Sequence, residues 1–459
     1  MRWLLSFLLA TLLGTAQALS TTGSRLLVVI DDVADKDNYS QFWKDLESRG
    51  YTVKFETPKS SSLSLFKLGA LAYDHLIILP SKSKGLGPNL TPNILVDYLK
   101  NDGNILLTMS GDGSIPSSIA STLLEFDITL PPDRNSVVVD HFNYDKNSAA
   151  EKHDVLLVPL PGGSRGDLQN YFNVAGVLAI PRAVGHVLGN ANQLLTPIVR
   201  APETAYAYDP KENEAIEDVF ASGSQLSLVS AFQARNSARL TVLGSAEMLQ
   251  DKWFDAKLLG RRGGAQIPSA NKVFAQRLSQ WTFHEIGVLK VGRLEHHLNE
   301  RGNPDSEEIN PSIYRIKNDV SYMIELSEWD VDSYKPFKPP GTDQVQLEFS
   351  MLSPFHRLQL EQTSKTANSS IFTTSFKLPD QHGIFNFLVN YKRPFMTNIF
   401  EKRTVTVRHF AHDEWPRSFV ISGAWPWISG IAVTVTGWLI FVGVWLYSKP
   451  TETSTKKRQ

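Results

Sequence analysis

Pairs of aspartate residues are this sequence's closest approach to a catalytic pattern. Asp31 and Asp32 follow a strongly apolar run, and ligands of open α/β sheets bind beyond the carboxyl ends of such strands. Paired carboxylates at that position are typical of phospho-accepting receiver domains that hold magnesium, but a third aspartate should then end the third strand. Residues 79–81 read Leu-Pro-Ser instead. The sequence therefore favours a structural role for Asp31 and Asp32.

Two further aspartate pairs have the Asp-x-Asp spacing of metal-dependent glycosyltransferases. They are Asp35-x-Asp37 and Asp330-x-Asp332. A chain with 47 acidic residues among 459 produces such a spacing by chance. A stand-alone glycosyltransferase that uses one of these pairs is therefore the weakest of three alternatives for the function.

Histidine and glycine patterns add no catalytic constellation. His296 and His297 are adjacent, so they cannot share one helix face, and no third ligand lies at metal spacing. Residues 111–114, Gly-Asp-Gly-Ser, could cradle an anion, but they match neither a P-loop nor a dinucleotide fingerprint. Arg165-Gly-Asp167 reads as accidental loop sequence.

Composition narrows the remaining chemistry. The chain has no cysteine, which excludes Cys-ligated zinc, thiol nucleophiles and iron–sulfur clusters. Its net charge of −1 excludes a general nucleic-acid binder, which needs basic excess to displace counterions from phosphates. With 42% hydrophobic and 20% charged residues, the chain is a folded one. We expect no catalytic residue, no metal site and no cofactor.

The first residues predict a secretory signal peptide. Arg2 precedes an apolar run over residues 4–13, and Ala16-x-Ala18 has the small residues of a cleavage site. The run is too short to span a bilayer. We expect residues 1–18 to be removed, so that Leu19 begins the mature chain.

A second apolar segment predicts a transmembrane helix over residues 428–447. It contains no charge over 20 residues, and Trp and Tyr flank both of its ends as in interfacial belts. The tail at 448–459 is basic, which predicts a cytosolic tail and a type I protein with its bulk in the lumen. Gly430, Thr434 and Gly437 share one helix face, a candidate contact with another spanning helix; alternatively, such residues are simply frequent in membrane helices.

Two short motifs bear on the compartment. Lys456 and Lys457 stand third and fourth from the last residue, the spacing of a dilysine signal that a retrieval coat reads to return proteins to the endoplasmic reticulum. The alternative is ordinary stop-transfer charge. N-glycosylation sequons occur at Asn38, Asn89 and Asn368, and Pro92 lowers the expected use of the second.

The elements that would position these residues fall into two luminal domains. Over residues 19–290, buried apolar runs alternate with amphipathic helices. This alternation predicts a doubly wound, mostly parallel α/β domain with a β-rich insertion at about 135–235. From about residue 310, apolar residues recur with period two between Pro- and Gly-containing turns, which predicts an antiparallel β-sandwich over residues 291–415. The strands expected in the first domain are at 25–30, 51–56, 75–80, 104–109 and 239–245.

Several stretches of the chain resemble a known family. They read Trp281-Thr-Phe-His-Glu-Ile-Gly-Val-Leu-Lys-Val-Gly292, Val345-Gln-Leu-Glu-Phe349, Phe376-Lys-Leu-Pro-Asp380, Gly383-Ile-Phe-Asn-Phe387 and Val389-Asn-Tyr391. Together with His296-His297, they resemble the DDOST-type subunit of the oligosaccharyltransferase complex, the wheat-germ-agglutinin-binding-protein family of fungi. The resemblance extends from the strand at 26–32 to the dilysine tail, over nearly the whole chain.

The resemblance implies a role in moving a preassembled glycan from dolichyl diphosphate to Asn-X-Ser/Thr asparagines in the endoplasmic reticulum. In that family a separate polytopic subunit is catalytic, and the DDOST-type chain packs on ribophorin-type and defender-against-death-type subunits. We therefore expect a non-catalytic, structural subunit in the endoplasmic reticulum membrane. The alternative is a luminal carbohydrate-binding receptor, which exposed aromatic platforms would favour.

Overall fold

The computed structural model describes most of the chain. Residues 1–18, Arg165-Gly-Asp167 and Lys456-Lys457 lie outside the described residues, so the signal peptide and the dilysine signal stay predictions. The chain separates into two compact units, which divide between Val407 and Arg408. The described ranges are 19–83, 85–113, 115–133, 135–160, 171–209, 219–261, 263, 265–300, 307–415 and 422–447.

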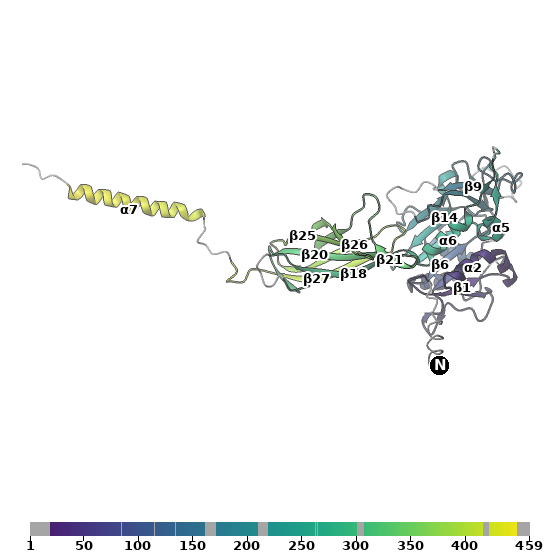
Figure 1. Cartoon of the computed structure of the whole chain (residues 1–459), viewed down its shortest axis with the longest axis horizontal. Helices are drawn as coiled ribbons and strands as arrows, with labels where there is room; N and C mark the ends of the chain where they lie inside the picture. The colour runs from purple at the N-terminus through teal and green to yellow at the C-terminus, as the bar shows by residue number, and fades with distance from the viewer. Residues whose placement is uncertain are drawn as a thin grey trace, which may run out of the picture. The chain divides into compact units, whose positions relative to one another are not determined.

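Five parallel strands form one half of a large sheet (Figure 1). Their apolar runs are buried on both faces, as the sequence predicts: every residue of β6 is buried. The mixed α/β class is thereby confirmed. In spatial order the strands are β2 (Thr52–Glu56), β1 (Arg25–Val29), β5 (His75–Ile78), β6 (Asn104–Thr108) and β15 (Arg239–Leu243).

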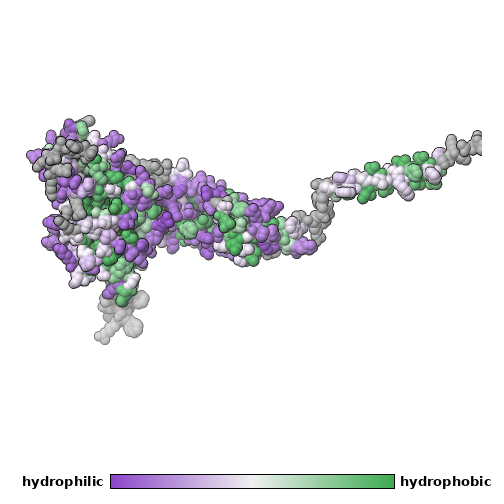
Figure 2. Space-filling view, turned by 180° about the vertical axis from the view of Figure 1, so that it is seen from behind, coloured by the Kyte–Doolittle hydropathy of each residue, from purple (hydrophilic) through white to green (hydrophobic). Residues whose placement is uncertain are grey.

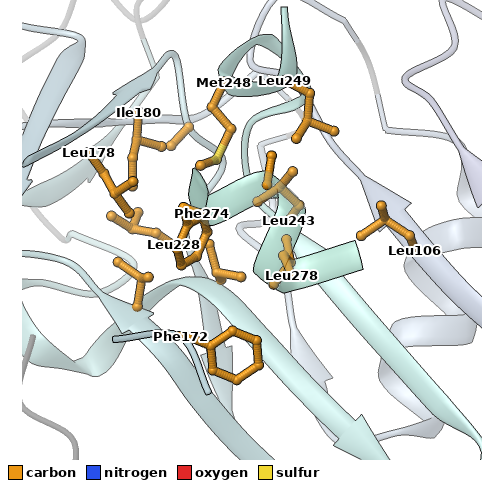
Figure 3. Packing of buried hydrophobic residues seen from close by; sticks show 14 of the residues in the cluster. Leu106, Phe172, Leu178, Ile180, Leu228, Leu243, Met248, Leu249, Phe274 and Leu278 are labelled. Atoms are coloured by element: carbon orange, nitrogen blue, oxygen red, sulfur yellow. The ribbon is translucent and has the colours of Figure 1, made fainter. Parts of the chain in front are cut away.

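Helices cover both faces of this parallel half. Leu26 and Val28 of β1 belong to one hydrophobic cluster, with residues of α2 (Ser40–Ser48) and α6 (Asn271–Thr282). Leu27 and Val29 point the other way, into a second cluster with α3 (Pro92–Lys100) and α4 (Ser117–Glu125). Figure 3 shows part of the first cluster, where Phe274 and Leu278 of α6 lie against Leu228, Leu243 and Leu106 of the sheet.

Beyond β15 the sheet becomes antiparallel, where the sequence predicts a mostly parallel sheet. The cause is the short connection of residues 234–238, which joins β14 to β15 as a hairpin closed by the bond from the Ala234 amide to the Ala238 carbonyl. Strands from the predicted insertion thus extend the main sheet. They are β14 (Leu226–Gln233), β11 (His186–Leu188) and β12 (Leu195–Arg200), with β7 (Ile128–Thr129) on β11.

Short ladders and turns complete this region. Two-stranded ladders join β8 (Val137–Val139) to β13 (Tyr206–Tyr208), β9 (Val155–Leu160) to β10 (Gly176–Pro181), β3 (Phe66–Lys67) to β4 (Ala70–Leu71) and β16 (Lys257–Leu258) to β17 (Ile267–Pro268). The short helices are η1 (Val33–Tyr39), η2 (Gly223–Gln225), η3 (Ala246–Leu249) and α5 (Asp251–Phe254).

Two antiparallel sheets follow, each of five strands. Aromatic side chains from both sheets fill the space between them: the ring of Tyr322 stacks on Phe387 at 5.5 Å between centroids, and Phe349 contacts Phe376 at 5.4 Å. The first sheet holds β18 (Ile286–Leu298), β20 (Asp319–Asp330), β21 (Ser333–Pro336), β24 (Glu361–Lys365) and β25 (Ser370–Lys377). The second holds β19 (Ile313–Arg315), β22 (Gln346–Ser350), β23 (Pro354–Gln359), β26 (Gly383–Tyr391) and β27 (Ile399–Arg408).

A buried arginine joins the two regions of the first unit. The guanidinium of Arg239, which is fully buried, donates hydrogen bonds to the carbonyl oxygens of Trp281, Ile286 and Gly287. The Trp281 indole donates in turn to the carbonyl of Phe395, at 2.8 Å. These hydrogen bonds fix the connection between α6 and the long strand β18.

The described part of the second unit contains η6 (Ser422–Ala424) and α7 (Trp425–Leu446). Helix α7 is 22 residues long and apolar enough to cross a membrane, and hydrophobic residues line it in Figure 2. It begins three residues before the predicted span of 428–447, and Pro426 sits in its first turn, where a proline is tolerated.

Candidate functional site: a polar crevice at the carboxyl ends of the parallel strands

A polar crevice of about 210 Å³ lies where the parallel strands end. Ligands of doubly wound sheets bind at this edge, and the segments after β1, β5 and β6 supply polar groups there. Glu247 comes from the segment after the parallel strand β15, and Arg182 from the segment after β10. The charged and hydroxyl side chains of the crevice include Asp31, Ser81, Asp112, Arg182 and Glu247.

Asp31 and Asp32 are both engaged in local hydrogen bonds. Asp31 accepts from the Ser81 hydroxyl and from the Lys82 amide, each at 2.6 Å, which ties the end of β1 to the end of β5. Asp32 accepts from the Ala34 amide at 2.9 Å and so caps η1. These contacts agree with the structural role that the sequence favours.

Arg182 is the central charge of the crevice. It bonds Glu247 at 2.6 Å and also pairs with Asp112, so two carboxylates from different segments share one guanidinium. Burial raises the pKa of Glu247 above its usual range, in spite of the Arg182 bond that acts in the opposite direction. The second Glu247 oxygen, Oε1, is buried without a hydrogen-bond partner among the described residues.

A second cavity of about 500 Å³ adjoins the same ion pair, because Arg182 and Glu247 line both. Its walls carry charges of both signs, among them Asp154 and Lys252. Trp253 also lines it but is only 5% exposed, so it offers little ring face to a ligand. The arrangement can hydrogen-bond a hydroxyl-rich molecule, while the described residues contain no group of three His, Asp or Glu that could hold a metal.

Sequence reasoning placed neither Arg182 nor Glu247 in a site. Arg182 comes from the segment after β10 and has a φ of 44°, a left-handed conformation that no sequence motif announces. Glu247 lies in η3, directly after the last parallel strand β15. Its position after a buried strand is the one signal that could have identified it. The rule is the one applied to Asp31: ligands of open α/β sheets bind beyond the carboxyl ends of the strands.

The two Asp-x-Asp pairs do not come together. Asp35 lines the crevice, whereas Asp330 ends β20 and forms an ion pair with Lys335 on the adjacent strand β21. Asp332 accepts a hydrogen bond from the Ser333 hydroxyl. An aspartate with its charge already paired is poorly placed to take up a metal ion.

His296 belongs to the core of the sandwich. Its ring stacks on Phe387 at 4.9 Å between centroids, and its Nδ1 lies 2.7 Å from the Tyr314 hydroxyl. Burial lowers its pKa to about 4, with a smaller contribution from Arg403. Its neighbour His297 points to the opposite face of β18, as alternate residues of a strand must.

The three sequons differ in exposure. Asn38 in η1 and Asn368 in the turn between β24 and β25 are exposed, while Asn89 before α3 is partly buried. Asn38 also lines the crevice. Attachment of glycan at these asparagines stays a prediction.

The predicted contact face of α7 meets no described residue outside the helix at its two glycines. A Cβ atom added at Gly430 or Gly437 would meet nothing within 4 Å, and the Thr434 hydroxyl donates to the Gly430 carbonyl at 2.9 Å. The glycines are therefore not required by any contact within the described residues. Contact with a partner helix stays a prediction.

Comparison with known proteins assigns the family. A family model described as the OST48 N-terminal domain matches residues 17–285, and a second, the OST48 middle domain, matches residues 296–449. The chain is 34% identical over 454 residues to the 48 kDa subunit of dolichyl-diphosphooligosaccharide–protein glycosyltransferase of Caenorhabditis elegans, with 98% of this chain and 97% of that protein covered.

Relatives from a plant and a yeast match over a similar length. The corresponding 48 kDa subunit of Arabidopsis thaliana is 30% identical over 449 residues, covering 96% of this chain and 97% of the relative. The subunit WBP1 of the same glycosyltransferase from Saccharomyces cerevisiae is 30% identical over 442 residues, covering 95% and 94%. By two adjoining family models and by full-length relatives, the chain belongs to the OST48 family.

Proposed function

We propose that this chain is a non-catalytic, structural subunit of the oligosaccharyltransferase complex, which transfers a preassembled glycan from dolichyl diphosphate to Asn-X-Ser/Thr asparagines. The observation that carries the proposal is the full-length match to relatives named as the 48 kDa subunit of that glycosyltransferase. The accessory role is supported by the crevice, where Asp31 and Arg182 are occupied in holding neighbouring segments together.

The proposal places the chain in the endoplasmic reticulum membrane as a single-pass type I protein. Helix α7 would cross the bilayer, residues 19–415 would lie in the lumen, and residues 448–459 would face the cytosol. The apolar character of α7 supports the membrane anchor, and the basic tail supports the orientation. Lys456 and Lys457 would return escaped protein through the retrieval coat.

The partners would be the polytopic catalytic subunit, a ribophorin-type subunit and a defender-against-death-type subunit. The face of Gly430, Thr434 and Gly437 would contact one of them inside the bilayer, because small residues let two helices approach closely. That these glycines face open space within this chain supports the assignment.

Purification from microsomes in mild detergent tests the proposal. We expect a tagged chain to bring down several membrane proteins and a peptide-glycosylating activity, and depletion of the chain to leave secretory proteins under-glycosylated. A chain that purifies alone, together with normal glycosylation after depletion, would overturn it. Transfer activity in the purified chain by itself would instead support a stand-alone glycosyltransferase.

Sequon use can be read in the same preparation. Asn38→Gln and Asn368→Gln should each increase the gel mobility of the chain by one glycan, and Asn89→Gln should change it least because Asn89 is partly buried. Endoglycosidase treatment should remove the differences among the variants. Unchanged mobility in all three would contradict a glycosylated luminal chain.

A second candidate function is carbohydrate binding in the lumen. The observation that favours it is the Glu247 oxygen without a partner at the crevice, since a sugar hydroxyl could donate to it. Glycan titration of the full chain, followed by NMR saturation transfer, should then show binding that Glu247→Gln weakens. Binding that is equal in both chains would exclude the crevice as the site.

A further inference from the structure

A third and larger cleft lies between the antiparallel half of the main sheet and the sandwich. Its volume is about 600 Å³. Thr196 of β12, its partner Ala231 on β14 and Gln233 at the end of β14 line it from the sheet. Phe395 and Asn398 line it from the connection between β26 and β27.

The charge of this cleft has one sign. Arg235, Lys392 and Arg393 line it, and no Asp or Glu is among its described lining residues, although the chain as a whole carries a net charge of −1. Arg393 is neutralised from behind by Asp343, whose oxygens accept from its guanidinium. Arg235 and Lys392 are exposed, and within the described ranges neither has a carboxylate within 4.0 Å. Two cations therefore remain without a counter-charge at the cleft.

A buried acceptor in the cleft also lacks a partner. Gln233 is 8% exposed, and its Nε2 donates to the Met396 carbonyl, which fixes the orientation of the amide. The other amide atom, Oε1, has no hydrogen bond among the described residues. A buried acceptor without a hydrogen bond destabilises the fold, so the site favours a ligand that brings an N–H or O–H donor.

The cleft also borders an open strand edge. Among the described strands, β12 pairs with β14 alone, so its other edge is free. Leu194 and Thr196, at the start of β12, belong to the lining. A free edge next to a pocket is where an extended peptide adds to a sheet, with backbone bonds for affinity and side-chain contacts for specificity.

We propose that this cleft binds an extended acidic peptide segment of a partner protein. A backbone amide of the segment donates to Gln233 Oε1, and its carboxylates pair with Arg235 and Lys392, which line the cleft from the segments that follow β14 and β26. A small anion has no backbone to pair with the free edge of β12, whereas an extended segment does. The inference deepens the proposed function, and rests on it only in taking the partner to be another subunit of the complex.

Peptide binding to the full chain in detergent micelles tests the inference. The probe is a fluorescein-labelled decapeptide of alternating glutamate and valine, followed by fluorescence anisotropy. We expect saturable binding that weakens with salt, and a loss of at least about tenfold in affinity in the double variant Arg235→Glu/Lys392→Glu. Lys402→Glu, an exposed lysine of β27 outside the cleft lining, is the matched control and should bind as the parent does.

A second variant separates the buried acceptor from the charges. Gln233→Leu should weaken the peptide while leaving the salt dependence unchanged, because it removes the acceptor and no charge. Since this residue is buried, Gln193→Glu at the exposed lining provides a variant that touches no buried contact and should also weaken binding.

Three results would overturn the inference. One is equal binding of a decapeptide in which lysine replaces glutamate. Another is an unchanged affinity in the double variant. The third is displacement of the peptide by millimolar inorganic phosphate that itself binds with the same dependence on Arg235 and Lys392, which would make the cleft a small-anion site. Co-purification of the complex is measured separately, so a chain that binds no acidic peptide yet assembles would reject the cleft and keep the proposed function.

Discussion

The α/β region and the sandwich are filled in different ways. Charged and imidazole side chains such as Arg239, Glu285 and His75 are fully buried in the α/β region. The sandwich is closed by rings instead, with Phe349 and Phe385 stacked at 4.7 Å between centroids. Rings gain from area removed from water and tolerate small shifts, while buried charges require every partner in place. The α/β region therefore depends on hydrogen bonds and ion pairs of specific geometry, and the sandwich depends on the apolar area that its rings bury.

One network of buried polar side chains lies where α6 leads into β18. Glu285 accepts there from the Arg49 guanidinium and the Tyr51 hydroxyl, each at 2.6 Å. Arg49 also donates to the hydroxyl of Ser279 in α6, at 2.8 Å. Burial, and then the charge of Glu285, raise the pKa of Tyr51 well above its usual range, so the phenol stays a donor. This network fixes the direction in which the chain leaves the first region.

The largest effect is expected from Arg239. Arg239→Met removes the guanidinium that donates to the carbonyls of Trp281, Ile286 and Gly287. The first and third of these still accept from the amides of His284 and Thr397, but each lost hydrogen bond to a charged group costs about 1.5–3 kcal/mol. We expect a loss of about 3–5 kcal/mol in the free energy of unfolding of the full chain, measured by denaturant titration in detergent. Burial already lowers the pKa of Arg239 to about 9, so relief from burying the charge offsets part of the loss.

The control for this change is Arg239→Lys, which keeps a cation but not the planar fork that reaches several carbonyls. It should be intermediate in stability. Hydrogen exchange should show the added opening at β15 and at the start of β18, with β26 unchanged. If β26 opened equally, the two regions would share one cooperative unit and the comparison would fail.

A loss of comparable size is expected from Phe387→Ala in the sandwich. Phe387 of β26 contacts Tyr322 on the facing sheet and Phe349 on the neighbouring strand β22, and truncation of a buried phenylalanine costs about 3–5 kcal/mol. Phe387→Leu, which keeps most of the volume, should cost less than half as much. This dependence on size distinguishes Phe387 from Arg239. In a core stabilised by buried apolar area, the loss in free energy of unfolding should increase with the side-chain volume removed, and the same denaturant titrations measure it.

The sequence indicates the buried strands and amphipathic helices well, because their signals are local. Strand β1 and helix α3 follow from an apolar run and from Pro92 in a first helical turn. The sequence pattern does not indicate strand β18, because bulges between Ile286 and Val288 and between Val291 and Leu294 shift the alternation of its side chains. A period-two search reads such a strand as irregular.

The crevice is predictable only in part for a similar reason. Asp31 is found because it directly follows a strand, and the rule about strand ends then applies. Arg182 is not, since it reaches Asp112 and Glu247 from a distant segment through a left-handed backbone conformation. Long-range pairing of this kind depends on the folded sheet and leaves no spacing in the sequence.

A fall in pH should lower the stability of the two regions to different extents, and by less than the core substitutions do. Burial lowers the pKa of His75 and of His186 to about 4 in the α/β region, and lowers that of His284 well below its usual range. Since the unfolded chain takes up protons near pH 6.5, this stability is complete above that pH and is lost as the pH falls toward 4. In the sandwich, His296 is the histidine whose pKa burial lowers in the same way, to about 4.

We therefore expect β5 and β14 to lose protection from hydrogen exchange at a higher pH than β26 does. His186→Gln should flatten the pH dependence of the α/β region, because it removes the titration and can keep a hydrogen bond to Ser230. Each pKa unit removed corresponds to about 1.4 kcal/mol. If β26 opened first on acidification, buried imidazoles would not explain the acid sensitivity.

The smallest effects are expected where the two regions are alike, at their solvent-exposed ion pairs. Lys54 pairs with Glu56 on β2 at 2.8 Å, and Arg357 on β23 pairs with Glu348 at 3.2 Å. Both cations are more than half exposed, so water and salt screen the attraction and each pair contributes about 0–1 kcal/mol. Lys54→Met and Arg357→Met should each change the free energy of unfolding by less than about 0.5 kcal/mol, and equally in both regions. The free energies are measured at high and low salt. A markedly larger loss for Lys54→Met would mean that charge interactions stabilise the surface of the α/β region as well as its interior. Equal small losses would mean that this stabilisation is limited to the buried network around Arg239 and Glu285.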